Sequence, residues 1–180
     1  ASFKRFTVIQ QAQALEYVKN HPLPVVIKAD GLAAGKGVVV AETTLDAENA
    51  IKDILGGSFG SAGAEVVVEA FLKGEEASVF AICDGRNFLT LAPAQDHKRA
   101  FDGDKGKNTG GMGAFAPAAI VTEEILKKVK EKIIAPTLAG MAEEGAPFIG
   151  CLFVGLMIDN GEPSVVEFNC RFGDPETQAV

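Results

Sequence analysis

A long apolar segment followed directly by a turn signal is the feature that most constrains the fold of this chain. Residues 148–158 are almost all apolar, which is typical of a strand in the middle of a sheet, covered on both faces. Asn160-Gly161 comes next, and this dipeptide favours the tight turn of a β-hairpin. The sequence therefore predicts an antiparallel hairpin whose second strand is the segment 165–172.

The second strand of this hairpin alternates two kinds of side chain. Because neighbouring residues of a strand face opposite sides, Glu167, Asn169 and Arg171 would share one face. The opposite face would be apolar, formed by Val166, Phe168, Cys170 and Phe172. A carboxylate and a nearby amide oxygen can share one Mg²⁺ ion, and an arginine beside them can hold a phosphate bidentately. The pattern indicates a metal and phosphate site; the alternative is the solvated face of a half-buried strand.

Composition and charge exclude several classes of protein. The formal net charge of −7 argues against nucleic acid as the main partner, because a phosphate backbone requires a basic surface. With 47% hydrophobic residues among 180, the chain is globular and long enough for one large domain or two small ones. The longest apolar run, 151–158, is too short to span a membrane and no signal peptide is visible, so no membrane partner is expected.

The cysteines indicate the compartment of the protein, and the two ends of the sequence indicate whether it is a fragment. Cys83, Cys151 and Cys170 lie in apolar segments without paired spacing, which predicts buried thiols in a reducing, cytoplasmic compartment. Asp174-Pro175-Glu176 has the pattern of a helix start, and the sequence stops soon afterwards at Val180. There is no initiator methionine either, so we expect both ends to be cut: a piece of a longer protein, with its second unit truncated at the C-terminal end.

Residues 1–72 are predicted to form a small α+β unit. Its elements are, in order, a helix, two strands, a helix and a strand: 10–20, 24–28, 38–41, 44–55 and 65–72. The loop between the first two strands contains Lys36 and three glycines, and the backbone N–H groups of such a loop can close around an anion. It is not a P-loop, because Gly37 replaces the metal-binding Ser or Thr and a strand follows. A phosphate-covering flap and a flexible hairpin loop remain as alternatives.

Two glutamates flank the passage from this unit to the next strand. Burying Glu69 and Glu76 would be costly unless hydrogen-bond donors met them. The amino group of adenine and a ribose hydroxyl are such donors. The alternative is that both are surface acids, the commoner fate of glutamate.

Residues 73–180 are predicted to form a larger unit with a mostly antiparallel sheet. Strands are expected at 75–83 and 88–93. The polar cluster 95–99 then opens a glycine-rich loop, 100–113, and such loops are more often functional than simple connections.

The longest helix is expected between this loop and the hairpin. It would start near Thr122 and be kinked or divided near Ala135 by Pro136. The lysines of the helix are interpreted as its solvent-exposed face, without a function: Lys127, Lys128, Lys130 and Lys132.

Four segments, in order along the chain, resemble the glycinamide ribonucleotide synthetase (phosphoribosylamine–glycine ligase) family of the ATP-grasp superfamily: 28–38, 95–99, 108–113 and 167–176. The resemblance implies an α+β ATP-grasp fold in which ATP lies between a lid subdomain with its flap, 1–72, and a core subdomain with the metal and substrate site, 73–180. It also implies an ATP-dependent ligase of de novo purine biosynthesis. Glycine would be activated as glycyl phosphate and joined to 5-phosphoribosylamine, giving glycinamide ribonucleotide, ADP and phosphate.

The resemblance implies a nucleotide-binding set drawn from both subdomains: Lys28, Gly35, Lys36, Gly37, Glu69, Phe71, Leu72, Glu76, Arg99 and Asn108. Lys28 would contact the ATP phosphates, and Lys36 with its glycines would close over them as a flap. The segment 69–72 would frame adenine, largely through backbone groups, and Glu76 would hold the ribose.

The same resemblance implies the metal, catalytic and substrate residues. Glu167 and Asn169 would bind Mg²⁺, for which Mn²⁺ can substitute. Arg171 would steady the transferring phosphoryl group and would be catalytic together with Lys36 and Asp174. Asp174 would also face the amine substrates, and the phosphoribosyl end would meet Asp96 and Lys98.

Two other functions remain open at this stage. One is another ATP-grasp ligase that activates formate or bicarbonate for a purine precursor, and the other is a nucleotide-binding fragment that is inactive on its own. Many ATP-grasp relatives carry an additional carboxylate on the strand before the hairpin, but 151–158 has none, which argues against carboxylase-type members. The expected partners are small molecules (ATP, glycine and 5-phosphoribosylamine), and the chain is expected to be a monomer.

Overall fold

The computed structural model describes the chain apart from residues 32–36, 98, 103–104 and 110; at 61, 99 and 105–108 it describes the backbone alone. The chain divides into two compact units, Ala1–Leu72 and Lys73–Val180. Each unit has a hydrophobic core of its own.

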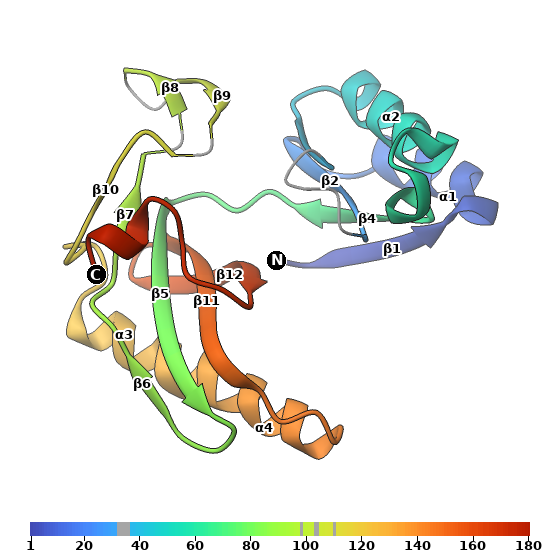
Figure 1. Cartoon of the computed structure of the whole chain (residues 1–180). Helices are drawn as coiled ribbons and strands as arrows, with labels where there is room; N and C mark the ends of the chain where they lie inside the picture. The colour runs from blue at the N-terminus through green and yellow to red at the C-terminus, as the bar shows by residue number, and fades with distance from the viewer. Residues whose placement is uncertain (32–36, 98, 103–104, 110) are drawn as a thin grey trace. The chain divides into compact units, whose positions relative to one another are not determined.

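The unit Ala1–Leu72 packs two helices against a four-stranded antiparallel sheet (Figure 1). The sheet order is β1 (Phe3–Thr7), β4 (Glu65–Ala70), β2 (Val25–Ala29), β3 (Val38–Ala41). The helices are α1 (Gln11–Lys19) and α2 (Thr44–Asp53), and short helical turns lie at Val8–Gln10, Ile54–Ser58 and Gly60–Gly63. Helix α2 starts where predicted because the Thr43 hydroxyl accepts a hydrogen bond from the Asp46 N–H at 3.1 Å.

Strand β1 is absent from the sequence prediction. It pairs with β4 from Phe3↔Glu69 to Thr7↔Glu65, and Phe6 is its buried residue. A strand with so little buried surface has no clear hydrophobic alternation, so only its partner, distant in sequence, defines it. The last strand of the unit is also shorter than predicted, since β4 ends at Ala70.

The unit Lys73–Val180 is built on a second four-stranded antiparallel sheet, in the order β12 (Glu162–Asn169), β11 (Ile149–Asp159), β5 (Glu75–Asp84), β6 (Phe88–Thr90). Short two-stranded pairs follow β6: β7 (Gln95–Asp96) with β10 (Ala114–Phe115), and β8 (Arg99–Phe101) with β9 (Lys105–Asn108). The predicted hairpin is confirmed, and β11 lies inside the sheet as expected. Asn160 and Gly161 both have positive φ, at 49° and 79°, as the tight turn requires.

Helices α3 (Glu123–Val129) and α4 (Ala135–Glu143) cover one face of this sheet (Figure 1). Alternate residues of β5 and β11 pack beneath them, among them Val79, Val154 and Leu156. A wider helical turn, Lys130–Ile134, separates the helices, and the proline lies in the first turn of α4. The predicted division near Ala135 is therefore confirmed, because proline cannot donate within a continuous helix.

Expectations about the segment after β12 need correction. The strand ends at Asn169, so Arg171 and Phe172 lie outside it and strand alternation no longer applies. Cys170 is exposed rather than buried, whereas Cys83 and Cys151 are buried. The expected helix start is only a short 3₁₀ turn, Glu176–Gln178, and no side chain caps it.

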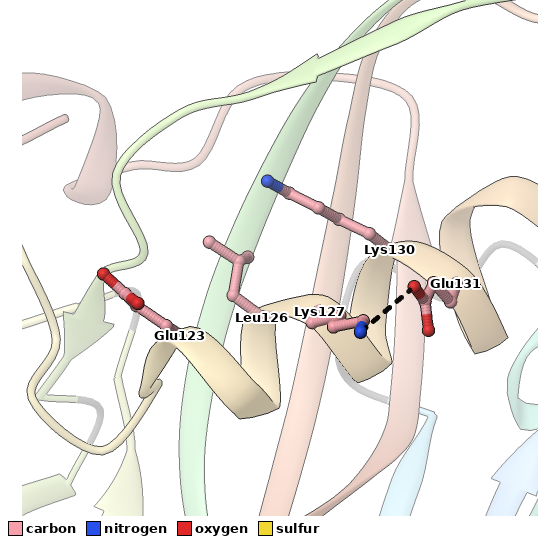
Figure 2. Close-up of a pocket in the computed structure, with 5 residues that line it drawn as sticks. All are labelled: Glu123, Leu126, Lys127, Lys130 and Glu131. Carbon is pink, nitrogen blue, oxygen red and sulfur yellow. Dashed lines mark ion pairs between the residues drawn. The ribbon is translucent and has the colours of Figure 1, made fainter.

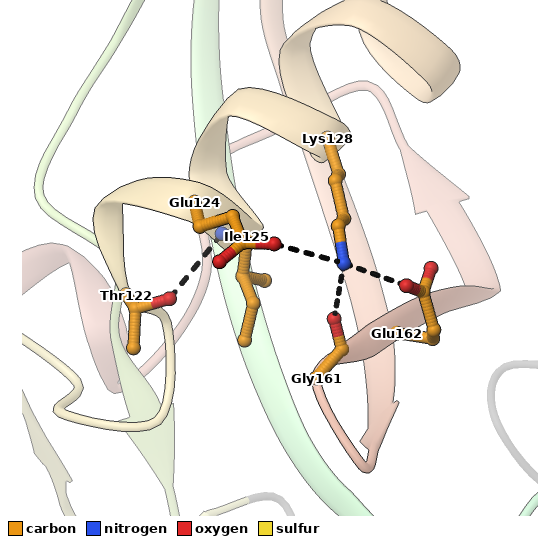
Figure 3. Close-up of polar contacts among 6 residues, drawn as sticks. All are labelled: Thr122, Glu124, Ile125, Lys128, Gly161 and Glu162. Atoms are coloured by element: carbon orange, nitrogen blue, oxygen red, sulfur yellow. Dashed lines mark hydrogen bonds and ion pairs between the residues drawn. The ribbon is translucent and has the colours of Figure 1, made fainter.

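Lys128 fastens helix α3 to the hairpin turn, which corrects its interpretation as a plain exposed residue. Its ammonium donates to the Gly161 carbonyl at 3.0 Å and to the Glu162 carboxylate at 2.6 Å (Figure 3). The Glu124 carboxylate lies 3.5 Å away. The hydrogen bond from Lys128 lowers the pKa of Glu162, and the same bond raises the pKa of Lys128.

We expect Lys128→Met to lower the thermal stability of the chain at neutral pH, and Lys127→Met, its exposed neighbour, to leave it nearly unchanged. A depressed carboxyl pKa contributes stability that is present above the ordinary value of 4.5 and is lost in acid, whereas the raised lysine pKa contributes below 10.5. The difference between the two variants should therefore be largest at neutral pH and become smaller in acid as Glu162 is protonated, leaving the part due to the Gly161 carbonyl; circular dichroism melting measures it. Equal melting temperatures for both variants at pH 7 would contradict the fastening role.

The turn between β5 and β6 is organised by one carboxylate. The N–H groups of Asn87 and Arg86 donate to Asp84 Oδ1 at 2.6 and 2.8 Å. These bonds, that of Asn87 first, lower the pKa of Asp84 from 3.8 to about 2.

We expect the Asp84 carboxyl to titrate near pH 2 when its ¹³C signal is followed by NMR. Because the folded pKa is depressed, the stability from Asp84 is present above about pH 4 and is lost as the pH falls towards 2. Asp84→Ala should destabilise the chain at pH 6 but much less at pH 2, and Asp84→Asn, which keeps an acceptor oxygen, should have the smaller effect. A titration midpoint at 3.8 would show that the turn does not form as described.

Candidate functional site

One face of the sheet in Lys73–Val180 carries polar residues on β5 and β12, with a glycine between them on β11. Ser78 on β5 is the cross-strand partner of Gly155 on β11, which in turn is the partner of Glu167 on β12. Directly paired residues lie on the same face of a sheet. Glycine at position 155 lets the Glu167 and Phe153 side chains lie close to the backbone of β11. A Cβ at this position would be crowded, 3.1 Å from Glu167 Cγ and 3.3 Å from a Phe153 ring carbon.

The next row of the same face brings the predicted metal and phosphate residues together. Phe80, Phe153 and Asn169 are successive cross-strand partners. The Asn169 amide donates to Glu167 Oε1 at 3.1 Å, so the two polar groups lie side by side. Arg171 lies beyond the strand end, yet its guanidinium carbon lies 5.9 Å from the centre of the Phe153 ring, and Nη1 donates to the Phe172 carbonyl at 2.9 Å.

These residues fit a magnesium ion by their donor chemistry. Glu167 is exposed and Asn169 half-buried, so a carboxylate and an amide oxygen are available at one point. Asn169 can present its oxygen by a half-turn of the amide. Within the described residues no group of three or more His, Cys, Asp or Glu side chains could hold a metal. Mg²⁺ tolerates so small a protein ligand set because it usually retains waters and phosphate oxygens.

A glycine lies opposite Glu167, so β11 offers no second carboxylate at that position. Position 155 is where β11 approaches Glu167, and it carries no side chain. A lone glycine inside an apolar strand often marks such a close approach, and this is the signal that could have identified Gly155 from the sequence.

The remaining predicted residues of this unit are only partly described. Glu76 is exposed and is the partner of Met157 near the start of β5. Asp96 is half-buried in β7, and Asp174 is exposed. Arg99 and Asn108 are backbone partners in the β8–β9 pair, and their side chains, like Lys98, lie outside the described residues.

In the unit Ala1–Leu72 the structure pairs two predicted nucleotide residues with each other. The Lys28 ammonium lies 2.6 Å from a carboxylate oxygen of Glu69, and both side chains are more than three-quarters buried. Phe71 is exposed and Leu72 half-buried just after β4. The Gly37 carbonyl accepts from the Ala29 N–H at 2.8 Å, which closes the base of the glycine loop. Gly35 and Lys36 lie outside the described residues.

A hollow on helix α3 has no such chemistry. It is lined by Glu123, Leu126, Lys127, Lys130 and Glu131 (Figure 2). Its one drawn ion pair joins Lys127 and Glu131 at 3.9 Å between side chains that are mostly exposed. Ion pairs between exposed side chains contribute little to stability. Lys127 and Lys130 therefore remain without an assigned function.

The comparison with protein families decides where this chain belongs. Residues 1–177 match the family described as phosphoribosylglycinamide synthetase, ATP-grasp (A) domain. The chain belongs to this family. The expected ATP-grasp membership and the α+β fold class are thereby confirmed.

Relatives of the ATP-grasp (A) domain family support this at high identity. The phosphoribosylamine–glycine ligase of Vibrio vulnificus is 57% identical over 182 residues, covering 100% of this chain and 42% of that protein. That of Pseudomonas syringae pv. tomato is 56% identical, also with 42% of its length covered. The chain therefore spans less than half the length of the curated relatives it matches.

Solved structures agree with the family. The crystal structure of phosphoribosylamine–glycine ligase from Thermotoga maritima has a TM-score of 0.89 at 39% identity, covering 99% of this chain and 45% of that one. An L-amino acid ligase from Bacillus licheniformis has a TM-score of 0.65 at 21% identity, which shows the ATP-grasp fold alone. No helix among the described residues is both long and apolar enough to cross a membrane.

Proposed function

We propose that this chain is the ATP-grasp region of a phosphoribosylamine–glycine ligase, which joins glycine to 5-phosphoribosylamine with conversion of ATP to ADP and phosphate. The observation that supports the proposal is that Glu167 and Asn169 are hydrogen-bonded neighbours on β12 and that Arg171, just past the strand end, lies against Phe153, in a chain of this family. Phosphoryl transfer depends on positioning and on positive charge rather than on a protein nucleophile. The absence of an activated nucleophile from the predicted site is therefore no objection.

The proposed roles follow the chemistry of the side chains. Glu167 and Asn169 would hold Mg²⁺, or Mn²⁺ in its place, and the bound metal would neutralise charge on the phosphate oxygens. Arg171 would bind the transferring phosphoryl group, Asp174 would face the amine substrates, and Asp96 and Lys98 would meet the phosphoribosyl end. Lys73–Val180 would act as the core subdomain.

Ala1–Leu72 would be the lid subdomain. Lys28 would bind the ATP phosphates, with Glu69 holding its ammonium in place at 2.6 Å. The loop around Lys36 would cover the phosphates and keep water from glycyl phosphate, which is easily hydrolysed. Phe71, Leu72 and Glu76 would contact the nucleoside, together with Arg99 and Asn108.

The test needs the segments that the chain does not contain, and a close relative supplies them. In the Vibrio vulnificus ligase, the matching segment is replaced by these 180 residues. We call the product the exchange protein. We expect it to release ADP only with glycine and 5-phosphoribosylamine together. Release that depends on formate or bicarbonate instead would overturn the proposal in favour of another ATP-grasp ligase.

The chain by itself is expected to bind ATP weakly and to turn over poorly, because absent segments would complete the amine pocket. Isothermal titration with a non-hydrolysable ATP analogue and Mg²⁺ measures the first point. Full-rate synthesis by the 180 residues alone would contradict the second.

A cytoplasmic location and a monomeric state remain predictions. Sedimentation equilibrium would check the monomeric state.

A further inference from the structure

Glu176 is a buried carboxylate that the proposed roles do not use. Its side chain is 3% exposed, as is that of Ser78, whose hydroxyl donates to Glu176 Oε1 at 3.0 Å. Across the described residues these two are the buried polar or charged side chains. A buried carboxylate is costly unless it is hydrogen-bonded, so its place in the fold requires a reason.

The Ser78 end of this contact is rigid. Its backbone N–H and carbonyl both pair with Ala94, at 2.8 and 2.9 Å. Ser78 also lies in the row of the sheet that continues through Gly155 to Glu167. The Ser78 hydroxyl, which binds Glu176, therefore lies in the same row of cross-strand partners as Glu167, the proposed metal ligand.

Glu176 lies in a compact loop, residues 173–177, which is closed by hydrogen bonds of its own. The Gly173 carbonyl accepts from the Thr177 N–H at 3.2 Å and from the Thr177 hydroxyl. A Cβ at residue 173 would overlap Glu176 Oε2, so only glycine allows the carboxylate to fold back against this position. A Cβ on Gly111 would likewise overlap the Pro175 ring, so the 173–177 loop is held from a second side.

Arg171 and Asp174 lie on the segment between two fixed points. The segment 170–175 leaves the sheet at Asn169 and is fastened again at Glu176. We propose that Glu176 is a positioning residue, whose hydrogen bond with Ser78 sets the placement of Arg171 and Asp174 on the segment that follows β12. Its kinetic consequence depends on the proposed function; its structural consequence does not.

The kinetic experiment compares variants of the exchange protein. Ser78→Ala and Glu176→Ala should each lower kcat about tenfold or more, because small misplacements of binding groups are costly in phosphoryl transfer. The double variant should lose no more than either single one, since both remove the same contact. KM for ATP should stay unchanged, and Gln178→Ala, on the same turn, should behave as the unmodified protein.

Glu176→Gln separates positioning from chemistry. Its amide oxygen can still accept from the Ser78 hydroxyl, so it should restore most of kcat. If Glu176→Gln is as inactive as Glu176→Ala, the negative charge itself acts in the reaction and the positioning role is overturned. Unchanged kcat in folded Ser78→Ala protein would overturn it as well.

A second measurement decides the inference if the exchange protein shows no ligase activity at all. Amide hydrogen exchange in the 180-residue chain should become faster at Thr177, Ala179 and Val180 in Ser78→Ala, because their N–H groups bond to the Gly173 and Glu176 carbonyls, while β5 and β11 stay protected as before. No change at these three amides would overturn the inference regardless of function. Faster exchange there, in an inactive exchange protein, would support the fastening and count against the proposed function alone.

Discussion

Glu167→Ala in the exchange protein is expected to lower kcat about a hundredfold or more while the melting temperature stays within a few degrees. Glu167 is exposed and supplies the carboxylate of the proposed Mg²⁺ pair, and the loss of one aligned electrostatic group in a transfer site costs roughly 10²–10³ in rate. The fold should survive, because an exposed side chain leaves no cavity and Asn169 remains solvated.

Steady-state kinetics at increasing Mg²⁺ measures this effect. Glu167→Ala should need more metal for half-maximal activity, whereas Glu143→Ala, a change of the same size on the exposed surface of α4, should not. Binding of Mn²⁺ with an ATP analogue, followed by electron paramagnetic resonance, gives a readout independent of turnover. Unaltered kinetics and unaltered Mn²⁺ binding would remove the metal assignment.

Phe80→Ala is expected to lower the free energy of unfolding of the unit Lys73–Val180 by about 3–5 kcal/mol. Phe80 is fully buried, lies edge-to-face with Phe153 at a centroid distance of 5.2 Å, and is stacked with Phe172 at 6.4 Å. Its removal leaves a cavity beneath the site, because Phe153 is held in the sheet and cannot move to fill it.

The measurement must report on this unit alone, because two compact units need not unfold together. Urea unfolding followed by the amide NMR signals of β11 satisfies that condition. Leu89→Ala is the matched control on the neighbouring strand, since Leu89 is 70% exposed, and it should cost less than about 0.5 kcal/mol. If Phe80→Ala fails to fold, Phe80→Leu should give a smaller, measurable loss; equal costs for Phe80→Leu and Leu89→Ala would contradict the packing argument.

Local signals in the sequence were sufficient for several elements of the fold. Asn160-Gly161 predicts the hairpin because few dipeptides accept positive φ at both positions. Thr43 caps α2, and Pro136 divides the long helix, for reasons contained within a few neighbouring residues. The strand β1 escaped prediction because its buried surface is small and its pairing with β4 is distant in the chain.

The candidate site shows the same division. Alternation along β12 sufficed to predict that Glu167 and Asn169 would be neighbours, and their hydrogen bond agrees with it. Alternation failed beyond Asn169, where the chain leaves the sheet and Cys170 becomes exposed.

By itself, the sequence determined the hairpin, the start of α2 and the family, since each depends on spacing along the chain. Tertiary structure alone decided that Glu176 is buried against Ser78 and that Lys128 binds the hairpin turn. These contacts join residues far apart in sequence. Their energy depends on desolvation and on the partner found in space, which no local pattern records.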